Sequence, residues 1–251
     1  MTRLGPAFFD RPIAHRGYHD KAEGCIENSP SAFAAAIKAG YGIELDVQLS
    51  RDGVPMVFHD TLLNRLTDQT GPVRDRDAQT LQGITLRDAT DTIPTLTEVL
   101  AQIDGAVPVL IELKDQHGEM GITDGVLEAA TAQALDGYTG DVALMSFNPN
   151  MIAPLQQLCP QIPRGLISSA WRKIDEPDVP VATRARLAAI PDFDTVGAEF
   201  LSHDVTNLDA PRVEQLKSQG IPIFCWTVRS RQQEHQARKV ADNITFEGYA
   251  A

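Results

Sequence analysis

The sequence predicts an α/β domain with the (β/α)8 barrel (TIM barrel) fold. Eight short apolar segments alternate with seven longer segments of helical pattern over 251 residues, and such strict alternation is typical of a closed parallel barrel. The predicted strands are rich in Val, Ile and Leu and show little polar alternation, as strands buried on both faces do. They cover residues 11–15, 42–48, 107–114, 142–146, 164–167, 195–199, 221–227 and 243–245.

The outer helices are predicted between these strands. The first begins at Ser29-Pro30 and ends at Gly40, a hydroxyl cap with proline in the first turn and glycine after the last. Only residues 246–251 follow the last strand, so the eighth outer helix is either missing or replaced by the N-terminal segment. The predicted helices cover residues 29–39, 96–103, 121–135, 149–158, 181–189, 210–218 and 230–239.

An irregular region follows the second strand. Residues 54–58 form an extra extended run, joined to that strand by Arg51-Asp52-Gly53, which predicts a hairpin turn. Residues 61–93 are polar, turn-rich and too numerous for an ordinary connection. We therefore expect one barrel domain over residues 1–251, with an insertion at about 61–93 over one end of the barrel.

Bulk composition excludes several classes of protein. The net charge of −12 disfavours binding to nucleic acid or to an anionic membrane surface. No apolar run approaches the roughly 20 residues of a transmembrane helix, and the N-terminus lacks the pattern of a signal peptide. Three widely spaced cysteines give neither a disulfide framework nor a zinc pattern. The sequence predicts a cytoplasmic protein without stable membrane insertion, and leaves its oligomeric state unknown.

Three carboxylates predict a metal site. Glu44 and Asp46 stand two apart on an apolar strand, so their side chains leave the same face. Two buried like charges are costly unless a cation or proton compensates them. Glu112 and Lys114 repeat this spacing on the next strand of the barrel, where Glu112 can supply a third ligand and Lys114 can hold a phosphate oxygen. The alternatives are a solvated edge strand and a buried Glu–Lys ion pair.

Two histidines complete the candidate site. His15 and Arg16 end the first strand, where barrel enzymes keep catalytic residues, and His59 ends the extra extended run. Either histidine alone would more often be structural; beside three carboxylates and Arg16 they predict an acid/base pair. Glu27-Asn28 either cap the first helix or brace the site. Trp226 is either a core residue or a wall for the alcohol part of a substrate.

Taken together, these segments resemble the glycerophosphodiester phosphodiesterase family. The resemblance implies a divalent metal ion, Mg²⁺ or Ca²⁺ with Mn²⁺ as a further option, held by Glu44, Asp46 and Glu112. It also implies that His15 and His59 are the acid/base pair and that Arg16 and Lys114 bind phosphate. The matching segments occur in family order and are Ile13-Ala14-His15-Arg16-Gly17, Glu27-Asn28, residues 42–47, residues 52–60, Ile93-Pro94-Thr95-Leu96, Ile111-Glu112-Leu113-Lys114 and Trp226-Thr227-Val228.

This chain departs from the family pattern at three places. Ser29 replaces the usual Thr, Arg229 replaces the usual Asn, and Thr245-Phe246-Glu247-Gly248 replaces the usual acidic ending. The expected activity is metal-dependent hydrolysis of glycerophosphodiesters to glycerol 3-phosphate and an alcohol. A phospholipase D-like activity on lysolipids or sphingolipids is the nearer alternative. A non-catalytic phosphodiester-binding protein is the alternative from another class.

Overall fold

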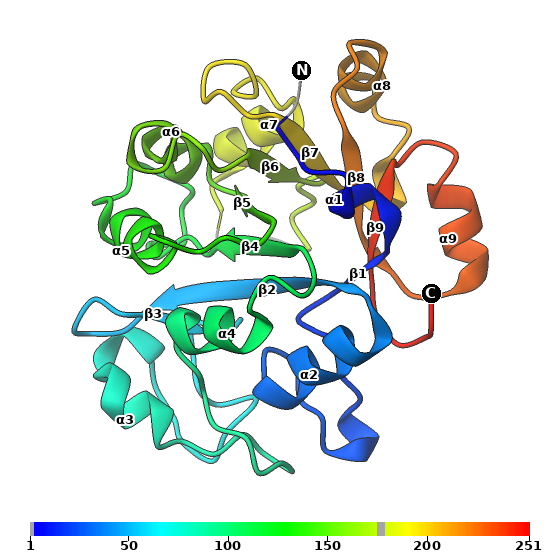
Figure 1. The fold of residues 1–251 in the computed structure, drawn as a ribbon. Helices are drawn as coiled ribbons and strands as arrows, with labels where there is room; N and C mark the ends of the chain where they lie inside the picture. The colour runs from blue at the N-terminus through cyan, green and yellow to red at the C-terminus, as the bar shows by residue number, and fades with distance from the viewer. Residues whose placement is uncertain (1–2, 175–178) are drawn as a thin grey trace.

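In a computed structural model that describes residues 3–174 and 179–251, eight parallel strands close into a barrel, which confirms the predicted fold (Figure 1). The short strand β1 pairs with both β2 and β9 and so closes the sheet. This closure places the first and last strands of the barrel side by side. The strands are β1 (Ile13–Ala14), β2 (Gly42–Leu49), β4 (Val109–Leu113), β5 (Val142–Ser146), β6 (Arg164–Ser168), β7 (Phe200–Asp204), β8 (Ile223–Val228) and β9 (Asn243–Phe246).

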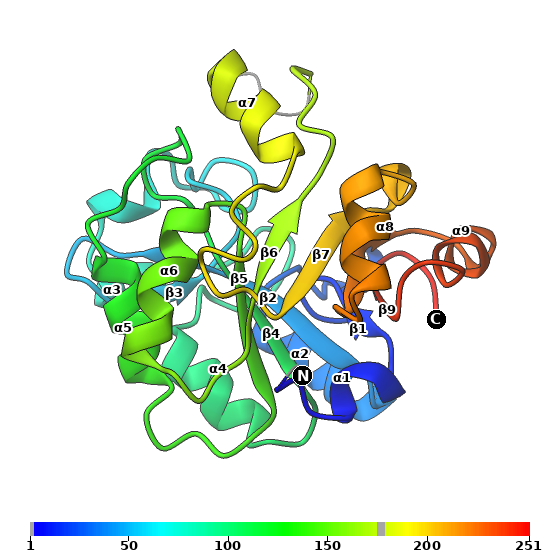
Figure 2. The same ribbon diagram turned by 90° about the horizontal axis from the view of Figure 1, so that it is seen from above.

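Helices surround the barrel (Figure 2), and apolar side chains fill the space between helices and strands. The first predicted cap is present: the Ser29 hydroxyl accepts a hydrogen bond from the Ala32 amide, and Gly40 ends the helix at φ 73°. The outer helices are α2 (Pro30–Ala39), α4 (Leu96–Ile103), α5 (Val126–Ala134), α6 (Pro149–Leu158), α7 (Val181–Ala188), α8 (Pro211–Ser218) and α9 (Arg231–Ala237).

Two predicted elements are misplaced. The strand expected at 195–199 is wrong, because β7 begins at Phe200. The preceding residues form turns in which Val196 and Ala198 donate backbone hydrogen bonds to earlier carbonyls. The true strand ends in polar residues, so its apolar pattern is weak. The helix expected at 121–135 begins only at Val126, after Gly125 at φ 75°.

The region after β2 has a small apolar core of its own. Strand β3 (Pro55–Val57) pairs antiparallel with β2, as the hairpin turn predicted. The residues that follow include a 3-10 turn, η2 (Val73–Asp75), and a short helix, α3 (Ala78–Gln82). Phe58, Leu63 and Leu81 are among the buried members of this core, which fixes the segment beside the β2–β3 hairpin.

The two ends of the chain close different parts of the barrel. Near the N-terminus, helix α1 (Ala7–Asp10) places Phe8 in the apolar core inside the barrel, and Asn243 donates hydrogen bonds of 2.7 Å to the carbonyls of Phe8 and Arg11. After β9 the described chain contains no further helix. Tyr41 packs edge-on against Phe246 there, with ring centroids 4.8 Å apart.

No helix in the described ranges has both the length and the apolar character needed to cross a membrane.

Candidate active site

A cavity of about 610 Å³ opens at the C-terminal ends of the strands, the end at which barrel enzymes act. Its volume is that of a small-molecule site. One side carries charged groups from the first half of the barrel, and the other side is largely apolar. The charged side includes His15, Arg16, Glu44, His59, Glu112 and Lys114, and the apolar side includes Met120, Met145, Phe147, Ile167, Val179 and Trp226.

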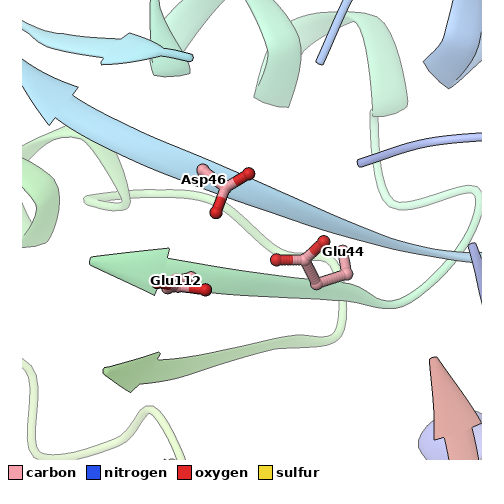
Figure 3. A group of neighbouring side chains, drawn as sticks. All are labelled: Glu44, Asp46 and Glu112. Atoms are coloured by element: carbon pink, nitrogen blue, oxygen red, sulfur yellow. The ribbon is translucent and has the colours of Figure 1, made fainter. Parts of the chain in front are cut away.

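The three carboxylates predicted from sequence lie together inside the barrel. Glu44 and Asp46 occupy alternate positions of β2, so their side chains share a face. Glu112 of β4 lies beside Asp46 in the parallel register of the two strands. Figure 3 shows the three side chains on the same side of these two strands. One oxygen from each carboxylate lies within 4.8 Å of the others, and all three residues are buried. The arrangement suits a hard cation that takes oxygen ligands.

The charge balance of this cluster also favours a cation. Burial and the neighbouring Asp46 and Glu112 carboxylates raise the pKa of Glu44 well above its ordinary value. Burial likewise raises the pKa of Glu112, although Lys114 opposes the shift. Burial would raise the pKa of Asp46 too, but the attraction of Lys114, His59 and Arg16 outweighs it and lowers this pKa. The cluster thus holds more carboxylates than its own cations compensate.

Lys114 forms the ion pair that the sequence left as an alternative. Its Nζ lies 2.7 Å from Oε1 of Glu112 and 3.4 Å from Oδ1 of Asp46. Burial disfavours the charged amine, but the attraction of these two carboxylates outweighs burial and raises the pKa of Lys114. The ammonium therefore stays charged at the edge of the cluster, within the wall of the cavity.

Arg16 is held in place by both its backbone and its side chain. Its backbone amide donates to Oε2 of Glu44 at 2.9 Å, and its Nη1 donates to Oε1 of Glu27 at 2.6 Å. Arg16 has φ 55°, and the next residue, Gly17, has φ 80°. A side chain at position 17 would meet Ala32 at 2.8 Å. The glycine at position 17 is therefore required by a tight turn against helix α2.

Asn28 connects the start of helix α2 to the carboxylate cluster. Its Nδ2 donates to Oδ2 of Asp46 at 2.8 Å, and its Oδ1 accepts from the Asp46 amide at 3.2 Å. The helix cap itself is Ser29. The structure thus places Asn28 against a candidate metal ligand, whereas the sequence left capping and bracing equally open.

Each of the two candidate catalytic histidines has a carboxylate next to its Nδ1 atom. His15 Nδ1 lies 2.5 Å from Oε2 of Glu247, and His59 Nδ1 lies 2.7 Å from Oδ1 of Asp60. A carboxylate at Nδ1 fixes the ring and leaves Nε2 for chemistry. His15 Nε2 is 4.0 Å from Oε2 of Glu44, so this ring stands beside the carboxylate cluster. Burial lowers the pKa of His15, and the hydrogen bond to Glu247 partly opposes that shift.

Comparison with known proteins identifies the family. The model of the glycerophosphoryl diester phosphodiesterase family matches residues 15–242. The chain belongs to this family. It is 32% identical to a glycerophosphodiester phosphodiesterase of Bacillus altitudinis, over 68% of this chain and 71% of the relative. It is 29% identical to one of Caldanaerobacter subterraneus, over 92% and 91% of the two chains.

Solved structures show the same fold. A phosphodiesterase of Oleispira antarctica, described as a complex with the product sn-glycerol-3-phosphate, superimposes with a TM-score of 0.78. Its sequence is 24% identical, and the match covers 96% of this chain and 94% of that one. A glycerophosphodiester phosphodiesterase of Thermotoga maritima gives a TM-score of 0.70 at 22% identity, over 94% of each chain.

Three residues that contact the candidate site were not predicted from the sequence: Glu247, Asp60 and Arg65. Glu247 belongs to the segment that departs from the family's acidic ending, yet it still supplies a carboxylate, here to His15. Asp60 directly follows His59 in the sequence and contacts its Nδ1. Arg65, inside the insertion, donates hydrogen bonds to both Asp60 and Glu27. The position of Glu247 just after the last strand was the available signal, because strand ends surround the cavity.

Trp226 lies in the wall of the cavity. Its Nε1 donates to the Ser202 carbonyl at 3.2 Å, and its ring packs edge-on against Phe147 with centroids 5.3 Å apart. The structure therefore places this residue at the cavity rather than in the outer core.

Proposed function

We propose that the protein hydrolyses glycerophosphodiesters to glycerol 3-phosphate and an alcohol in this cavity. One observation carries the proposal: three buried carboxylates lie together, and two of them, Glu44 and Glu112, line a cavity with two histidines whose Nδ1 atoms each contact a carboxylate. The geometry provides a cation site next to two groups able to transfer protons near neutral pH. Family membership supports phosphodiester hydrolysis as the reaction.

In this proposal Glu44, Asp46 and Glu112 hold one divalent metal ion. The oxygen donors and their uncompensated charge fit Mg²⁺, Ca²⁺ or Mn²⁺. The bound ion would neutralise the negative charge of the phosphoryl oxygens and would make the phosphorus atom more electrophilic. Asn28, through its two hydrogen bonds to Asp46, would hold one ligand in a fixed orientation.

Arg16 and Lys114 would bind the phosphate oxygens, since both are cations next to the carboxylate cluster. One histidine would remove a proton from the nucleophile, and the other would protonate the oxygen of the departing alcohol. The nucleophile is either water or the neighbouring glycerol hydroxyl, which would give a cyclic phosphate that water then opens. Asp60 and Glu247 would keep each ring in the tautomer that presents Nε2.

We also propose that residues 1–251 act as one catalytic domain. Arg65 in the insertion pairs with Glu27, which in turn pairs with Arg16 of the barrel. The insertion would thereby help to hold the phosphate-binding arginine.

The test is cleavage of glycerophosphocholine by the purified protein, with EDTA and with Mg²⁺, Ca²⁺ or Mn²⁺ added back. We expect EDTA to abolish release of glycerol 3-phosphate and at least one metal to restore it. His15→Ala and Glu44→Gln should each reduce turnover by about 100-fold or more. Full activity of either variant would refute the mechanism.

A second candidate function is cleavage of lysolipids or sphingolipids in the manner of phospholipase D. The observation that favours it is the apolar side of the cavity, formed in part by Met120, Phe147 and Val179, because an alkyl chain needs such a surface. Parallel assays with glycerophosphocholine and lysophosphatidylcholine decide between the two. Faster turnover of the lysolipid would make it the preferred substrate class.

A further inference from the structure

Strand β2 carries a third inward-facing polar side chain that the proposed chemistry does not use. Gln48 follows Glu44 and Asp46 at the same two-residue spacing, so its side chain leaves the same face of the strand. It is 3% exposed and lines the active-site cavity together with His59. A buried amide needs partners for its NH2 group and for its oxygen, and here these partners connect Gln48 to a proposed catalytic group.

The backbone carbonyl of His59 accepts a hydrogen bond from Gln48. The distance from Gln48 Nε2 to this carbonyl oxygen is 2.7 Å. The antiparallel pairing of the hairpin ends just before this point, with the Phe58 amide donating to the Asp46 carbonyl at 3.0 Å. No backbone amide of the described chain donates to the His59 carbonyl. The side chain of Gln48 therefore takes the place of a backbone hydrogen bond and holds the histidine to β2.

A second glutamine, Gln116, holds the side-chain amide of Gln48. Gln116 Nε2 donates to Gln48 Oε1 at 3.2 Å and also to the Lys114 carbonyl at 2.8 Å. Gln116 Oε1 accepts from the Leu49 amide at 3.2 Å. Arg74 of the insertion donates to the backbone carbonyl of Gln116 at 3.1 Å. We call Gln48 and Gln116 the amide relay, because together they connect the backbone of β2 to that of His59.

Backbone groups at both ends of the amide relay determine which way each side-chain amide faces. The Leu49 N–H can only donate, so the Gln116 atom next to it is the oxygen. The NH2 group of Gln116 then faces the oxygen of Gln48, which leaves the NH2 group of Gln48 for the His59 carbonyl. Every donor in the relay thus meets an acceptor. A flip of either amide would oppose two donors or two acceptors, so the relay has one orientation.

The amide relay and Asp60 act on different parts of His59. Asp60 contacts Nδ1 of the ring at 2.7 Å, whereas Gln48 contacts the backbone carbonyl. A ring held only at Nδ1 would still move whenever its backbone moved. Catalytic groups work only when they are held within about 0.5 Å of the productive position, so the backbone of this histidine needs an attachment of its own.

We propose that Gln48 and Gln116 are positioning residues, which hold the backbone of His59 so that its ring stays in place for proton transfer. The inference rests on the proposed function. Gln116 lines a separate cleft of about 390 Å³, and it reaches His59 through Gln48. The relay therefore predicts that a residue without contact to substrate affects the reaction.

The experiment compares Gln48→Met and Gln116→Met with a matched control, Gln102→Met. Methionine keeps the unbranched chain and removes the amide. Gln102 lies on helix α4 and its Nε2 also donates to a backbone carbonyl at 2.7 Å, that of Pro30. With glycerophosphocholine we expect Gln48→Met to lower kcat about 10- to 100-fold with KM within about threefold.

Gln116→Met should lower kcat about 3- to 30-fold, and Gln102→Met should stay within about twofold of the parent enzyme. Gln116 is only half-buried, so its variant keeps the test available if Gln48→Met unfolds. Losses in the relay variants no larger than in the control would overturn the proposal. A raised KM with unchanged kcat in Gln48→Met would assign that residue to substrate binding, and would overturn the proposal too.

The double variant shows whether the two glutamines act as one unit. We expect the kcat of Gln48→Met/Gln116→Met to equal that of Gln48→Met within about threefold, because Gln116 acts on His59 through Gln48. Losses that multiply would contradict the relay. The rise in Tm on addition of Mg²⁺, Ca²⁺ or Mn²⁺ should persist in every variant. A relay variant without this rise would show that the amides support the carboxylate cluster instead of the histidine, which would overturn the proposal.

Nuclear magnetic resonance separates failure of this inference from failure of the proposed function. Absence of cleavage by the parent protein would refute the proposed function alone. The ¹³C signal of the His59 carbonyl reports its hydrogen bond directly, and long-range ¹H–¹⁵N spectra report the proton positions on its ring. We expect both relay variants to shift these signals and Gln102→Met to leave them in place. Signals of His59 that stay unchanged in Gln116→Met would overturn the inference, whether or not the protein is active.

Discussion

His15 and Glu247 stand 232 positions apart in the sequence, yet His15 Nδ1 lies 2.5 Å from Oε2 of Glu247. Closure of the barrel brings them together, because β1 pairs directly with β9. Glu247 also accepts a hydrogen bond from Arg229 at 2.8 Å, so its carboxylate is fixed on both sides. The first strand thus supplies a candidate catalytic group that the last strand holds in position.

Glu247→Gln should lower activity by changing the charge next to His15 while preserving side-chain size. Burial lowers the pKa of His15 and Glu247 opposes that shift, so loss of the carboxylate should lower this pKa further. We expect a decrease in kcat of about 10- to 100-fold, and the limb of the pH–rate profile that reports His15 should move to lower pH. The measurement is kcat from pH 5 to 9.

Glu234→Gln is the control for this prediction. Glu234 pairs with Arg238 and accepts a hydrogen bond from Tyr249 on the outer surface, so its removal should leave the profile in place. A Glu247→Gln profile that overlays that of the parent enzyme would show that the carboxylate has no influence on the catalytic proton transfers.

Asp60→Asn should lower activity, because it removes the negative charge next to His59. Asp60 accepts from His59 Nδ1 and is held by Arg65, and the hydrogen bonds from these residues lower its pKa despite opposing burial. We expect kcat to fall about 10- to 100-fold with KM within about threefold. Steady-state kinetics check this, with Asp68→Asn, which removes an exposed partner of Arg87, as the control. A change confined to KM would contradict a role in proton transfer.

Glu44→Gln should stabilise the metal-free protein while abolishing its response to metal. A carboxyl group with a raised pKa costs stability as pH rises above its ordinary value of 4.5, and glutamine removes this cost. We expect Tm in EDTA at pH 7.5 to rise by roughly 2–4 °C for about 1 kcal/mol. The further rise that Mg²⁺, Ca²⁺ or Mn²⁺ gives the parent protein should disappear.

Differential scanning fluorimetry of Glu44→Gln, with and without metal, measures both effects. Glu214→Gln changes an exposed helix position and should leave Tm and its metal response unchanged. A Glu44→Gln protein that retains the full metal response would exclude Glu44 as a ligand.

The barrel and its candidate metal cluster could be predicted from sequence because both follow from local patterns. Alternate charged residues on an apolar strand, as at Glu44 and Asp46, must share a face, and parallel barrel order puts Glu112 on the next strand. Local patterns did not locate strand β7. Its residues Ser202 and His203 are polar, so this strand lacks the continuous apolar run that marks its neighbours.

The contacts of Glu247, Asp60 and Arg65 could not be predicted in this way. Glu247 reaches His15 only after the barrel closes, and the sequence pattern gives no register between the first and last strands. Arg65 belongs to an insertion whose path follows its own apolar core, and no periodicity relates it to Glu27. Long-range contacts of charged side chains thus required the structure.

Glu27→Gln should destabilise the protein in a pH-dependent manner. Burial alone would raise the pKa of Glu27, but the hydrogen bond from Arg65 and the attraction of Arg16 outweigh it and lower this pKa to about 2. A lowered carboxyl pKa contributes stability above the ordinary value of 4.5, and that stability is lost as pH falls toward about 2. We expect Glu27→Gln to reduce the free energy of unfolding by about 1–3 kcal/mol at pH 7.

The difference between Glu27→Gln and the parent protein should therefore shrink as pH is lowered from 4.5 to about 2, the window between the ordinary and the lowered pKa of Glu27. Urea unfolding at pH 7, 4 and 2.5 measures it. Asp88→Asn breaks an exposed pair with Lys21, 3.8 Å apart, and should change stability by less than about 0.5 kcal/mol at every pH. A Glu27→Gln difference that stays constant across this range would mean that the ionised carboxylate is not what stabilises the link between the insertion and the barrel.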